Sequence, residues 1–349
     1  MRSTSRLLCS LLALSTAVLP GCLEVGDEAD PELGEIESSL VAGQWPDDSV
    51  IVNKYSTRQV ALAPFNNRLY MAHTDKNSSS TNDLVVSSWN GVTWTSYFAT
   101  NLLSSSRPAL TAYNDRLHMI YRPQGASTLR MVSSSGGSLW TTPETAGRSL
   151  AIGNYSAENP HATVIGTNLY LTYCSNNGSS SYINIDKYNG TSWTAYQQFA
   201  VGYSGSSICQ HALLAPMPDA GIDAVELIYG VISKDPNSGT YNPWMYRRRG
   251  TIARSVQSWN SPQALFNSSA PVSVVTCNGE THLVHNGVVS PTELWWAYRS
   301  NGNWTRDYRV ANQWSSGGAT LGCLNDETPL MVHNESGSAR RLMQSIFAP

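Results

Sequence analysis

Short β-prone runs of apolar, β-branched and aromatic residues recur along this chain, and polar turn residues separate them. Residues 84–87 form one such run before Asn90-Gly91, and residues 94–98 form another after it. Asn-Gly is a strong hairpin signal, because a type I′ turn needs positive φ at both central residues. The pattern predicts two antiparallel strands joined by a tight turn at residues 90 and 91.

This hairpin recurs along the chain, and a tryptophan begins the second strand of each copy. The copies lie 45 to 66 residues apart. The six tryptophans are Trp45, Trp94, Trp140, Trp193, Trp259 and Trp304. A second hairpin turn falls between consecutive copies, most clearly at Asn66-Asn67, Asn114-Asp115 and Asn278-Gly279. Each repeat therefore supplies four strands, which we name A to D in chain order.

Repeats of four short strands are typical of a β-propeller, in which single blades cannot bury their faces and must close into a ring. Residues 45–54 read as a D strand, and residues 340–347 read as a C strand. The last blade can therefore take its fourth strand from the start of the folded region, which removes two free edges. We predict an all-β, six-bladed propeller of four-stranded antiparallel blades over residues 45–349.

Strand order also decides which loops share a face. The A–B and C–D turns lie on one face, the bottom, and the B–C and D–A loops lie on the other, the top. The B–C loops are rich in Ser, Asn, Gly and Pro, and the longest spans residues 231–242. Because variable loops on a rigid scaffold usually carry function, we expect binding on the top face.

Four cysteines lie within the predicted propeller, and they allow three pairings. Cys174 and Cys209 fall at the top ends of their strands, and Cys277 and Cys323 fall at the bottom ends. A crossed pairing would have to span a strand length of roughly 17–20 Å, whereas a disulfide needs Cα atoms within about 7 Å. The sequence predicts Cys174–Cys209 and Cys277–Cys323; four buried free thiols are the alternative.

The first 22 residues are typical of an export signal, with Arg2 and Arg6 before an apolar stretch too short for a permanent membrane helix. Leu19-Pro20-Gly21-Cys22 resembles the bacterial lipobox, which implies that Cys22 carries lipid. Ordinary signal cleavage, with Cys22 lost or left free, is the alternative. Residues 23–44 hold seven acidic and no basic residues, so we expect a disordered tether. The chain is thus predicted to be exported, either lipid-anchored in the bacterial cell envelope or secreted.

Overall composition narrows the classes of function. Charged residues make up only 13 % of the chain and the formal net charge is −3, which argues against nucleic-acid binding. Tyrosine (17) and tryptophan (11) far outnumber phenylalanine (5), and rings with a polar tip suit wet binding surfaces. There is no close Cys-x-x-Cys pair, and we expect no metal and no cofactor. We expect a monomer whose partner is a glycan or a surface protein, with membrane contact through the lipid alone.

The repeat resembles known exported propellers. Residues 87–94 resemble the Asp-box of bacterial sialidase-like propellers, Ser-x-Asp-x-Gly-x-Thr-Trp, with Ser87, Gly91, Thr93 and Trp94 matching and Trp89 in place of the Asp. The resemblance covers about 300 residues and implies the fold rather than the activity. A sialidase of that family has three arginines around a carboxylate, a Tyr-Glu nucleophile pair, an Asp acid and an Arg-Ile-Pro motif. This chain has no Arg-Ile-Pro, and we assign no catalytic residue.

One position of strand B carries a ring in all six repeats: His73, Tyr121, Tyr173, Tyr229, His285 and His333. The next position includes Arg122, Asn286 and Asn334. We expect His73 and these three side chains to line a binding funnel, with Arg122 foremost because its planar fork can hold two hydroxyls or a carboxylate. The alternative is that the rings pack between blades and bond to the backbone.

Strand C supplies a second set of candidates, namely Arg130, Glu293 and Trp295. Their residue types resemble those of six-bladed fucose lectins, which hold sugar between blades with Arg, Glu and Trp. The hypothesis is therefore a non-catalytic module that binds carbohydrate or a surface protein. A sialidase-like glycoside hydrolase and a structural interaction scaffold are the alternatives.

Overall fold

The computed structural model describes residues 45–75, 82–147, 156–176, 180–201, 207–221, 224–234, 241–252, 259–288, 290, 292–300, 302–325, 327–337 and 340–348. The chain divides into two units, Met1–Val41 and Ala42–Pro349, and all described residues belong to the second. The export signal, Cys22 and the acidic tether lie outside the described residues. So do parts of the predicted B–C loops, at residues 76–81, 177–179, 235–240, 289, 291 and 338.

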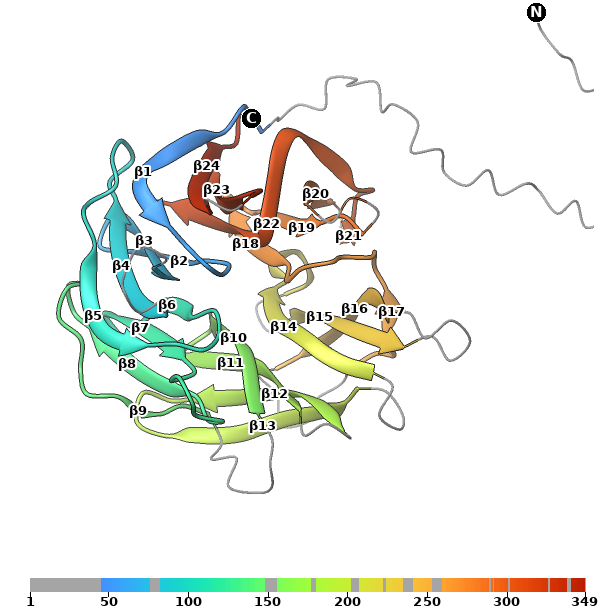
Figure 1. Cartoon of the computed structure of the whole chain (residues 1–349). Helices are drawn as coiled ribbons and strands as arrows, with labels where there is room; N and C mark the ends of the chain where they lie inside the picture. Colours follow the sequence, from blue (N-terminus) through green and yellow to red (C-terminus); the bar gives the residue numbers. More distant parts are fainter. Residues whose placement is uncertain are drawn as a thin grey trace, which may run out of the picture. The chain divides into compact units, whose positions relative to one another are not determined.

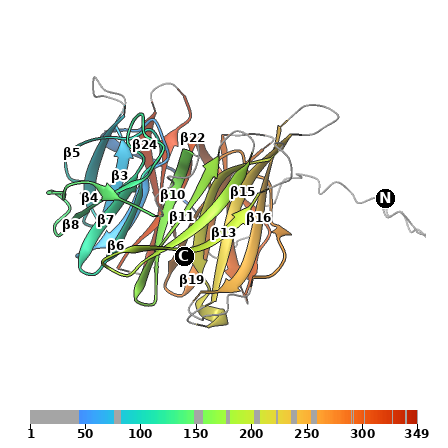
Figure 2. The same cartoon turned by 90° about the horizontal axis from the view of Figure 1, so that it is seen from below.

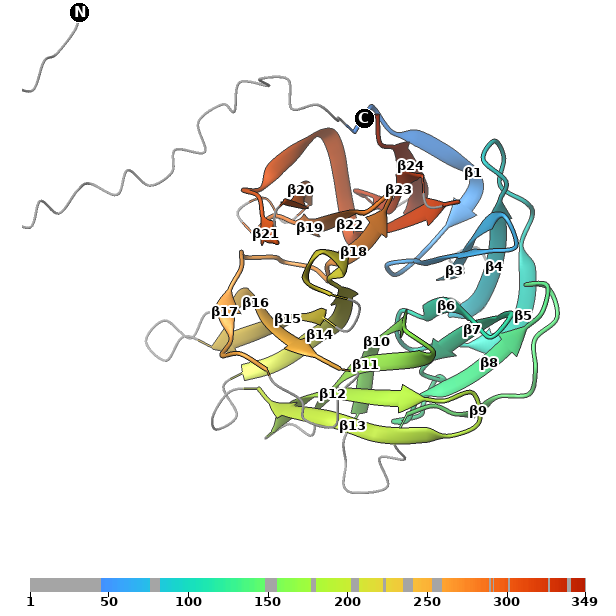
Figure 3. The ribbon, with the colours of Figure 1, turned by 180° about the vertical axis from the view of Figure 1, so that it is seen from behind.

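The described residues form antiparallel sheets that fan around a common axis, the arrangement of a β-propeller (Figure 1, Figure 3). The first sheet comprises β2 (Ala61–Phe65), β3 (Arg68–Thr74), β4 (Asp83–Trp89) and β5 (Phe98–Leu103). The second comprises β6 (Ala109–Tyr113), β7 (Arg116–Tyr121), β8 (Arg130–Ser134) and β9 (Glu144–Thr145). The third comprises β10 (Ser156–Ile165), β11 (Asn168–Asn176), β12 (Ser181–Tyr188) and β13 (Trp193–Ala200). The fourth comprises β14 (Ser207–Pro216), β15 (Ala224–Lys234), β16 (Tyr241–Thr251) and β17 (Gln263–Ala264).

The fifth sheet has eight strands, in the order β1-β24-β23-β22-β20-β19-β18, with β21 paired to β20. Its members are β1 (Ser49–Tyr55), β18 (Ser273–Cys277), β19 (Glu280–Asn286), β20 (Glu293–Ser300), β21 (Asn303–Trp304), β22 (Tyr308–Leu324), β23 (Thr328–Glu335) and β24 (Arg341–Ile346). The first part of β22 pairs with β20 up to Trp314, and its last part pairs with β23 from Ser315 onward. One continuous strand therefore joins two strand quartets. A 3₁₀ turn, η1 (Pro218–Ala220), precedes β15.

The first described strand pairs with the last. Ser49 of β1 lies opposite Gln344 of β24, and Val50 lies opposite Met343. Just before β1, the buried ring of Trp45 packs 5.2 Å from that of Phe347. The predicted partnership between the two ends of the folded region is present.

The A–B hairpin turns have the expected geometry. Asn66 and Asn67 both have positive φ (49° and 54°), as do Asn114 and Asp115 (47° and 54°). These values are typical of type I′ turns, which match the twist of the flanking strands. Asparagine and aspartate tolerate the left-handed region better than other non-glycine residues.

The type I′ turn predicted at residues 90 and 91 is wrong. Only Gly91 has positive φ (98°), and Trp89 pairs with Trp94 around a four-residue loop. The Asn90 side-chain oxygen accepts the amides of Val92 (3.0 Å) and Thr93 (2.8 Å). Because a side chain caps these amides, the loop does not need a second left-handed residue.

The second strand of each sheet is buried on both faces, since neighbouring sheets pack against it. Leu69 and Met71 of β3 are fully buried, as are Leu117 and Met119 of β7. Seen from the side, the sheets lie next to one another around the common axis (Figure 2). This packing makes the first strand of each quartet the lining of the axis.

Both predicted disulfides are confirmed. Cys174 of β11 bonds to Cys209 of β14, with Cα atoms 5.6 Å apart. Cys277 of β18 bonds to Cys323 of β22, with Cα atoms 6.0 Å apart. Each bridge joins adjacent strand quartets, and such bridges are typical of proteins that fold in an oxidising compartment.

Candidate functional site

The strand B position that carries a His or Tyr ring in each repeat is buried throughout, including at His73, His285 and His333. His285 Nδ1 lies 3.0 Å from the carbonyl oxygen of Asn286, and its Nε2 lies 3.2 Å from an Asp307 carboxylate oxygen. His333 repeats the arrangement with Asn334 O at 3.2 Å and both Asp48 oxygens at 3.0 Å. Both rings therefore lie beside an aspartate that stands directly before a strand, β22 for Asp307 and β1 for Asp48.

His73 occupies the same place with a different partner. Its ring contacts Tyr97 edge-on at 5.2 Å, and burial lowers its pKa to about 3. Tyr97, Asp307 and Asp48 each stand three residues after a hairpin tryptophan. The repeat therefore provides one partner position directly before the strand, at Tyr97 before β5, Asp307 before β22 and Asp48 before β1, and the ring on strand B packs on the residue that occupies it.

The next position of strand B carries the side chains that the sequence favours for binding. Asn286 Nδ2 donates to Ser315 O (2.8 Å), and Asn334 Nδ2 donates to Ser56 O (2.7 Å). Arg122 Nε donates to Ser105 Oγ at 2.7 Å. Ser105 and Ser56 lie in connections between strand quartets, and Ser315 lies in β22, where that strand passes from one quartet to the next. The three side chains therefore bond at the points where one quartet leads into the next.

The strand C candidates occupy two separate sheets. Arg130 Nη1 on β8 donates to Thr145 Oγ1 (2.9 Å), near the outer edge of its sheet. Glu293 on β20 forms an ion pair with Arg309 at 2.7 Å. Trp295 lies two residues further on, on the same face of the strand, and is partly buried beside Gly287.

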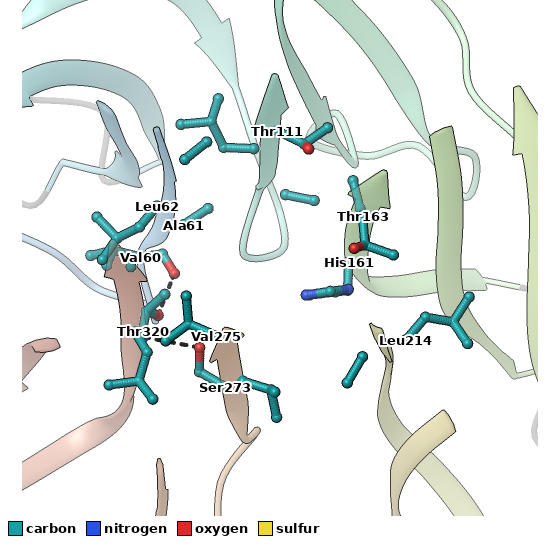
Figure 4. A pocket seen from close by; sticks show the side chains of 18 of the residues that line it. Val60, Ala61, Leu62, Thr111, His161, Thr163, Leu214, Ser273, Val275 and Thr320 are labelled. Atoms are coloured by element: carbon teal, nitrogen blue, oxygen red, sulfur yellow. Dashed lines mark hydrogen bonds between the residues drawn. The ribbon is translucent and has the colours of Figure 1, made fainter. Parts of the chain in front are cut away.

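A cavity of about 400 Å³ lies on the axis and is lined by the first strands of the quartets (Figure 4). Thr320 Oγ1 donates to Val60 O (2.7 Å), and Leu321 N donates to Ser273 Oγ (3.0 Å), so neighbouring strands bond across the ring. Most of the lining is small or apolar. His161 is the exception in Figure 4, where its imidazole projects into the cavity.

Polar side chains gather where the first strands begin, toward the top face. Gln59 Nε2 donates to Ala319 O (2.5 Å), and the Gln59 side-chain oxygen accepts from Nη1 of Arg107. Burial lowers the pKa of Arg107 to about 10. Burial, together with the charge of Arg107, lowers the pKa values of His161 and His211 to about 3. One cation is therefore flanked by two neutral imidazoles.

A second pocket, of about 460 Å³, lies on the top face beside β1 and β22, and we name it the β1–β22 pocket. Its lining residues are Asp47, Asp48, Asn312, Trp314, Glu335, Ser336 and Met343. The Trp314 side chain is 40 % exposed. Asn312 Nδ2 donates to Asp47 Oδ1 at 3.3 Å.

Charged groups around the β1–β22 pocket have partners. Arg341 grips Glu335 through two parallel bonds, Nε to Oε2 (2.8 Å) and Nη2 to Oε1 (2.5 Å). This grip holds the pKa of Glu335 below its ordinary value. Asp48 is held by His333, as described above. The pocket thus presents an aromatic face among planar polar groups that are already oriented.

Sequence reasoning missed both groups of residues. Trp314 is one of five tryptophans outside the hairpin series, so its position alone does not single it out. Arg107 directly precedes Pro108 just before the first strand of its repeat, where the sequence gives no sign of a binding role. Its burial beside two histidines from other repeats has no local signature in the sequence.

The described part of the chain contains no group of three or more His, Cys, Asp or Glu side chains placed to hold a metal ion. Within the same residues, no helix is long and apolar enough to cross a membrane.

No protein-family model matches this chain, and no curated protein matches it in sequence. Solved structures do. An α-L-arabinofuranosidase, Arb93A of Fusarium graminearum, solved with an iminosugar inhibitor, is 11 % identical with a TM-score of 0.62, over 87 % of this chain and 98 % of that one. The fucoside-bound lectin SapL1 is 12 % identical with a TM-score of 0.55, over 85 % and 94 %.

A Hadza microbial sialidase, Hz136, is 13 % identical with a TM-score of 0.57. The match covers 84 % of this chain and 65 % of the sialidase. At these identities the likeness establishes the β-propeller fold. Two of the three similar proteins are glycosidases and one is a lectin, so the fold alone does not separate cleavage from binding.

Proposed function

We propose that this chain is an exported six-bladed β-propeller that binds carbohydrate without cleaving it. The blade count follows if the eight-stranded sheet is two blades joined by β22. One blade is then β18, β19 and β20 with the first part of β22. The other is the last part of β22 with β23, β24 and β1. On this count the β1–β24 pairing closes the ring.

The observation that carries the proposed function is the β1–β22 pocket. Sugars are bound by an aromatic face together with planar polar side chains. Trp314 offers a partly exposed ring, and Asp47, Asn312 and Glu335 surround it with groups that bond hydroxyls. A binding role on the top face also agrees with the placement of the B–C and D–A loops there.

The charges of the pocket favour binding over hydrolysis. Glycoside hydrolysis needs a carboxylic acid with a raised pKa beside a second carboxylate. Arg341 shifts the pKa of Glu335 in the opposite direction, and Asp48 is engaged by His333. Binding is therefore the first candidate. A sialidase-like glycoside hydrolase is the second, because several carboxylates line one pocket.

Export and anchoring complete the proposal. The two disulfides support folding in an oxidising compartment. The lipobox-like residues 19–22 support lipid attachment at Cys22. Replacement Cys22→Ser should release the protein from membranes into the soluble fraction. Unchanged membrane partition would contradict the anchor.

A glycan array tests the proposed function. We expect the wild-type chain to retain at least one glycan, and Trp314→Ala to weaken that binding by about 2 kcal/mol, the scale of a buried aromatic anchor. Trp244→Ala is the matched control, because Trp244 is also 40 % exposed but lies on β16. Equal loss in both variants, or cleavage of the glycan, would contradict the proposal.

A further inference from the structure

Arg107 is a buried cation at the end of the axial cavity. It stands two residues before β6, lines the cavity, and is only 7 % exposed. Its Nη1 donates to the side-chain oxygen of Gln59. Among the described residues, its Nε and Nη2 have no hydrogen-bond partner although both are buried.

The charge of Arg107 has no described counter-ion. Burial is the cause of its lowered pKa, and no carboxylate contributes an opposing shift. The residue it bonds, Gln59, is neutral. Burying an unpaired guanidinium is costly, so such a charge in a folded protein is normally met by an anion.

The edge left unpaired is the edge that binds carboxylates. Nε–H and Nη2–H of a guanidinium point the same way and match the two oxygens of a carboxylate. Arg341 shows the arrangement within this chain, with Nε and Nη2 both bonded to the Glu335 carboxylate. Arg107 lines the axial cavity, and the same pair of donors is buried there without a partner among the described residues.

Two histidines, His161 and His211, lie close enough to Arg107 for its charge to act on them. His161 and His211 have pKa values lowered to about 3, so both are neutral near pH 7 and add no positive charge. Their Nδ1 atoms have no partner among the described residues. His161 projects into the cavity (Figure 4), where its ring can donate a bond to an entering anion.

We propose that Arg107, assisted by His161, binds a carboxylate group that enters through the axial cavity. The Nε and Nη2 atoms are buried, so side chains around them must move as the ligand arrives, and the cavity of about 400 Å³ offers space for that movement. The ligand is a simple carboxylate or a sugar acid, since both carry the group that fits the edge. This site is separate from the β1–β22 pocket.

The test is a titration of the melting temperature of the folded chain, because a ligand that binds only the native state raises it. Acetate and glucuronate are the probes, with glucose and with sodium chloride at matched ionic strength as controls. We expect a saturable rise with glucuronate alone if the ligand is a sugar acid, and with both acids if any carboxylate fits. No rise beyond that of chloride would overturn the proposal.

Variants locate the site. Arg107→Gln should raise at least tenfold the carboxylate concentration that gives the half-maximal rise in melting temperature. Arg341→Gln removes an exposed arginine from an ion pair and should leave that concentration unchanged. If Arg107→Gln does not fold, Arg107→Lys keeps the charge without the planar fork and should also respond at least tenfold more weakly. An unchanged response in a folded Arg107 variant would overturn the assignment. Trp314→Ala should respond like wild type, which separates this inference from the proposed function.

Discussion

The axial cavity and the β1–β22 pocket use similar side chains in opposite ways. At the pocket, Arg341 is exposed and pairs with Glu335 through both donors of one edge. At the cavity, Arg107 is buried and the same edge has no described partner. The side chains of the β1–β22 pocket are held in place by contacts within the chain. At the axial cavity, the charge of Arg107 has no described counter-ion, and we propose that a carboxylate ligand supplies it. The number of bonded guanidinium donors thus separates an arginine that is already paired within the chain from one that can still bind an anion.

The largest expected effect on stability comes from deleting the segment that lines the β1–β22 pocket while leaving the axial cavity unchanged. Deletion of Trp45 to Lys54 removes β1 almost entirely, together with Asp47 and Asp48, and leaves Arg107 in place. It exposes the edge of β24, so we expect aggregation and a marked fall in melting temperature. Size-exclusion chromatography and thermal unfolding measure both. A monomeric variant that melts like wild type would show that this strand does not close the ring.

Gln59 is the described hydrogen-bond partner of Arg107, and its replacement should lower the free energy of unfolding. Gln59→Leu leaves Nη1 of Arg107 unpaired in a buried place, which costs roughly 1–3 kcal/mol of unfolding free energy. Asn312→Ala, at the exposed bond to Asp47, should change it by less than about 0.5 kcal/mol. Urea titration compares the two variants. Equal losses would remove the contrast between the sites.

Acid should weaken the axial region through its histidines. His161 and His211 have pKa values near 3 in the folded chain and near 6.5 when unfolded. Between these values the unfolded chain binds protons that the folded chain does not, so stability falls as the pH falls from 6.5 toward 3. Each histidine contributes at most about 1.4 kcal/mol per pH unit. His211→Gln should therefore flatten the pH profile of the unfolding free energy, and an unchanged slope would contradict these shifts.

Arg122 should affect stability less than Gln59 does. Arg122→Ala removes the bond to Ser105 and should cost about 0.5–1.5 kcal/mol of stability. If the ligand is held by the strand B side chains, the same change should also weaken its binding by roughly 1–3 kcal/mol. Arg68→Ala, near a bottom turn, should leave binding unchanged. A larger binding loss in Arg68→Ala would move the site to the bottom face.

Periodic features of the sequence predicted most of the fold. The hairpin tryptophans gave the strand order, the pairing of the first strand with the last, and both disulfides, because each depends on a repeated local pattern. The turn at Asn90-Gly91 was predicted wrongly, since the dipeptide alone does not reveal that the Asn90 side chain caps two amides. Backbone and side chain compete for the same donors there.

The candidate sites were much harder to predict. His285 and His333 share a position, which the sequence reveals, but their aspartate partners come from distant segments, just before β22 and β1. Arg107, His161 and His211 meet only because three quartets converge on the axis. Such proximity follows from the packing of the quartets around the axis and has no spacing rule along the chain.

Strand β22 has a consequence for how the protein unfolds. It contributes to two neighbouring quartets without a loop between them, and the Cys277–Cys323 bridge ties the same quartets together. Neither quartet can detach while the other keeps its ladder, so the two should open as one cooperative unit. Amide hydrogen exchange should then give residues of β19 and β23 a common opening free energy, while the other four sheets can exchange separately. Strands β1 and β24, which pair with each other, belong to that shared unit.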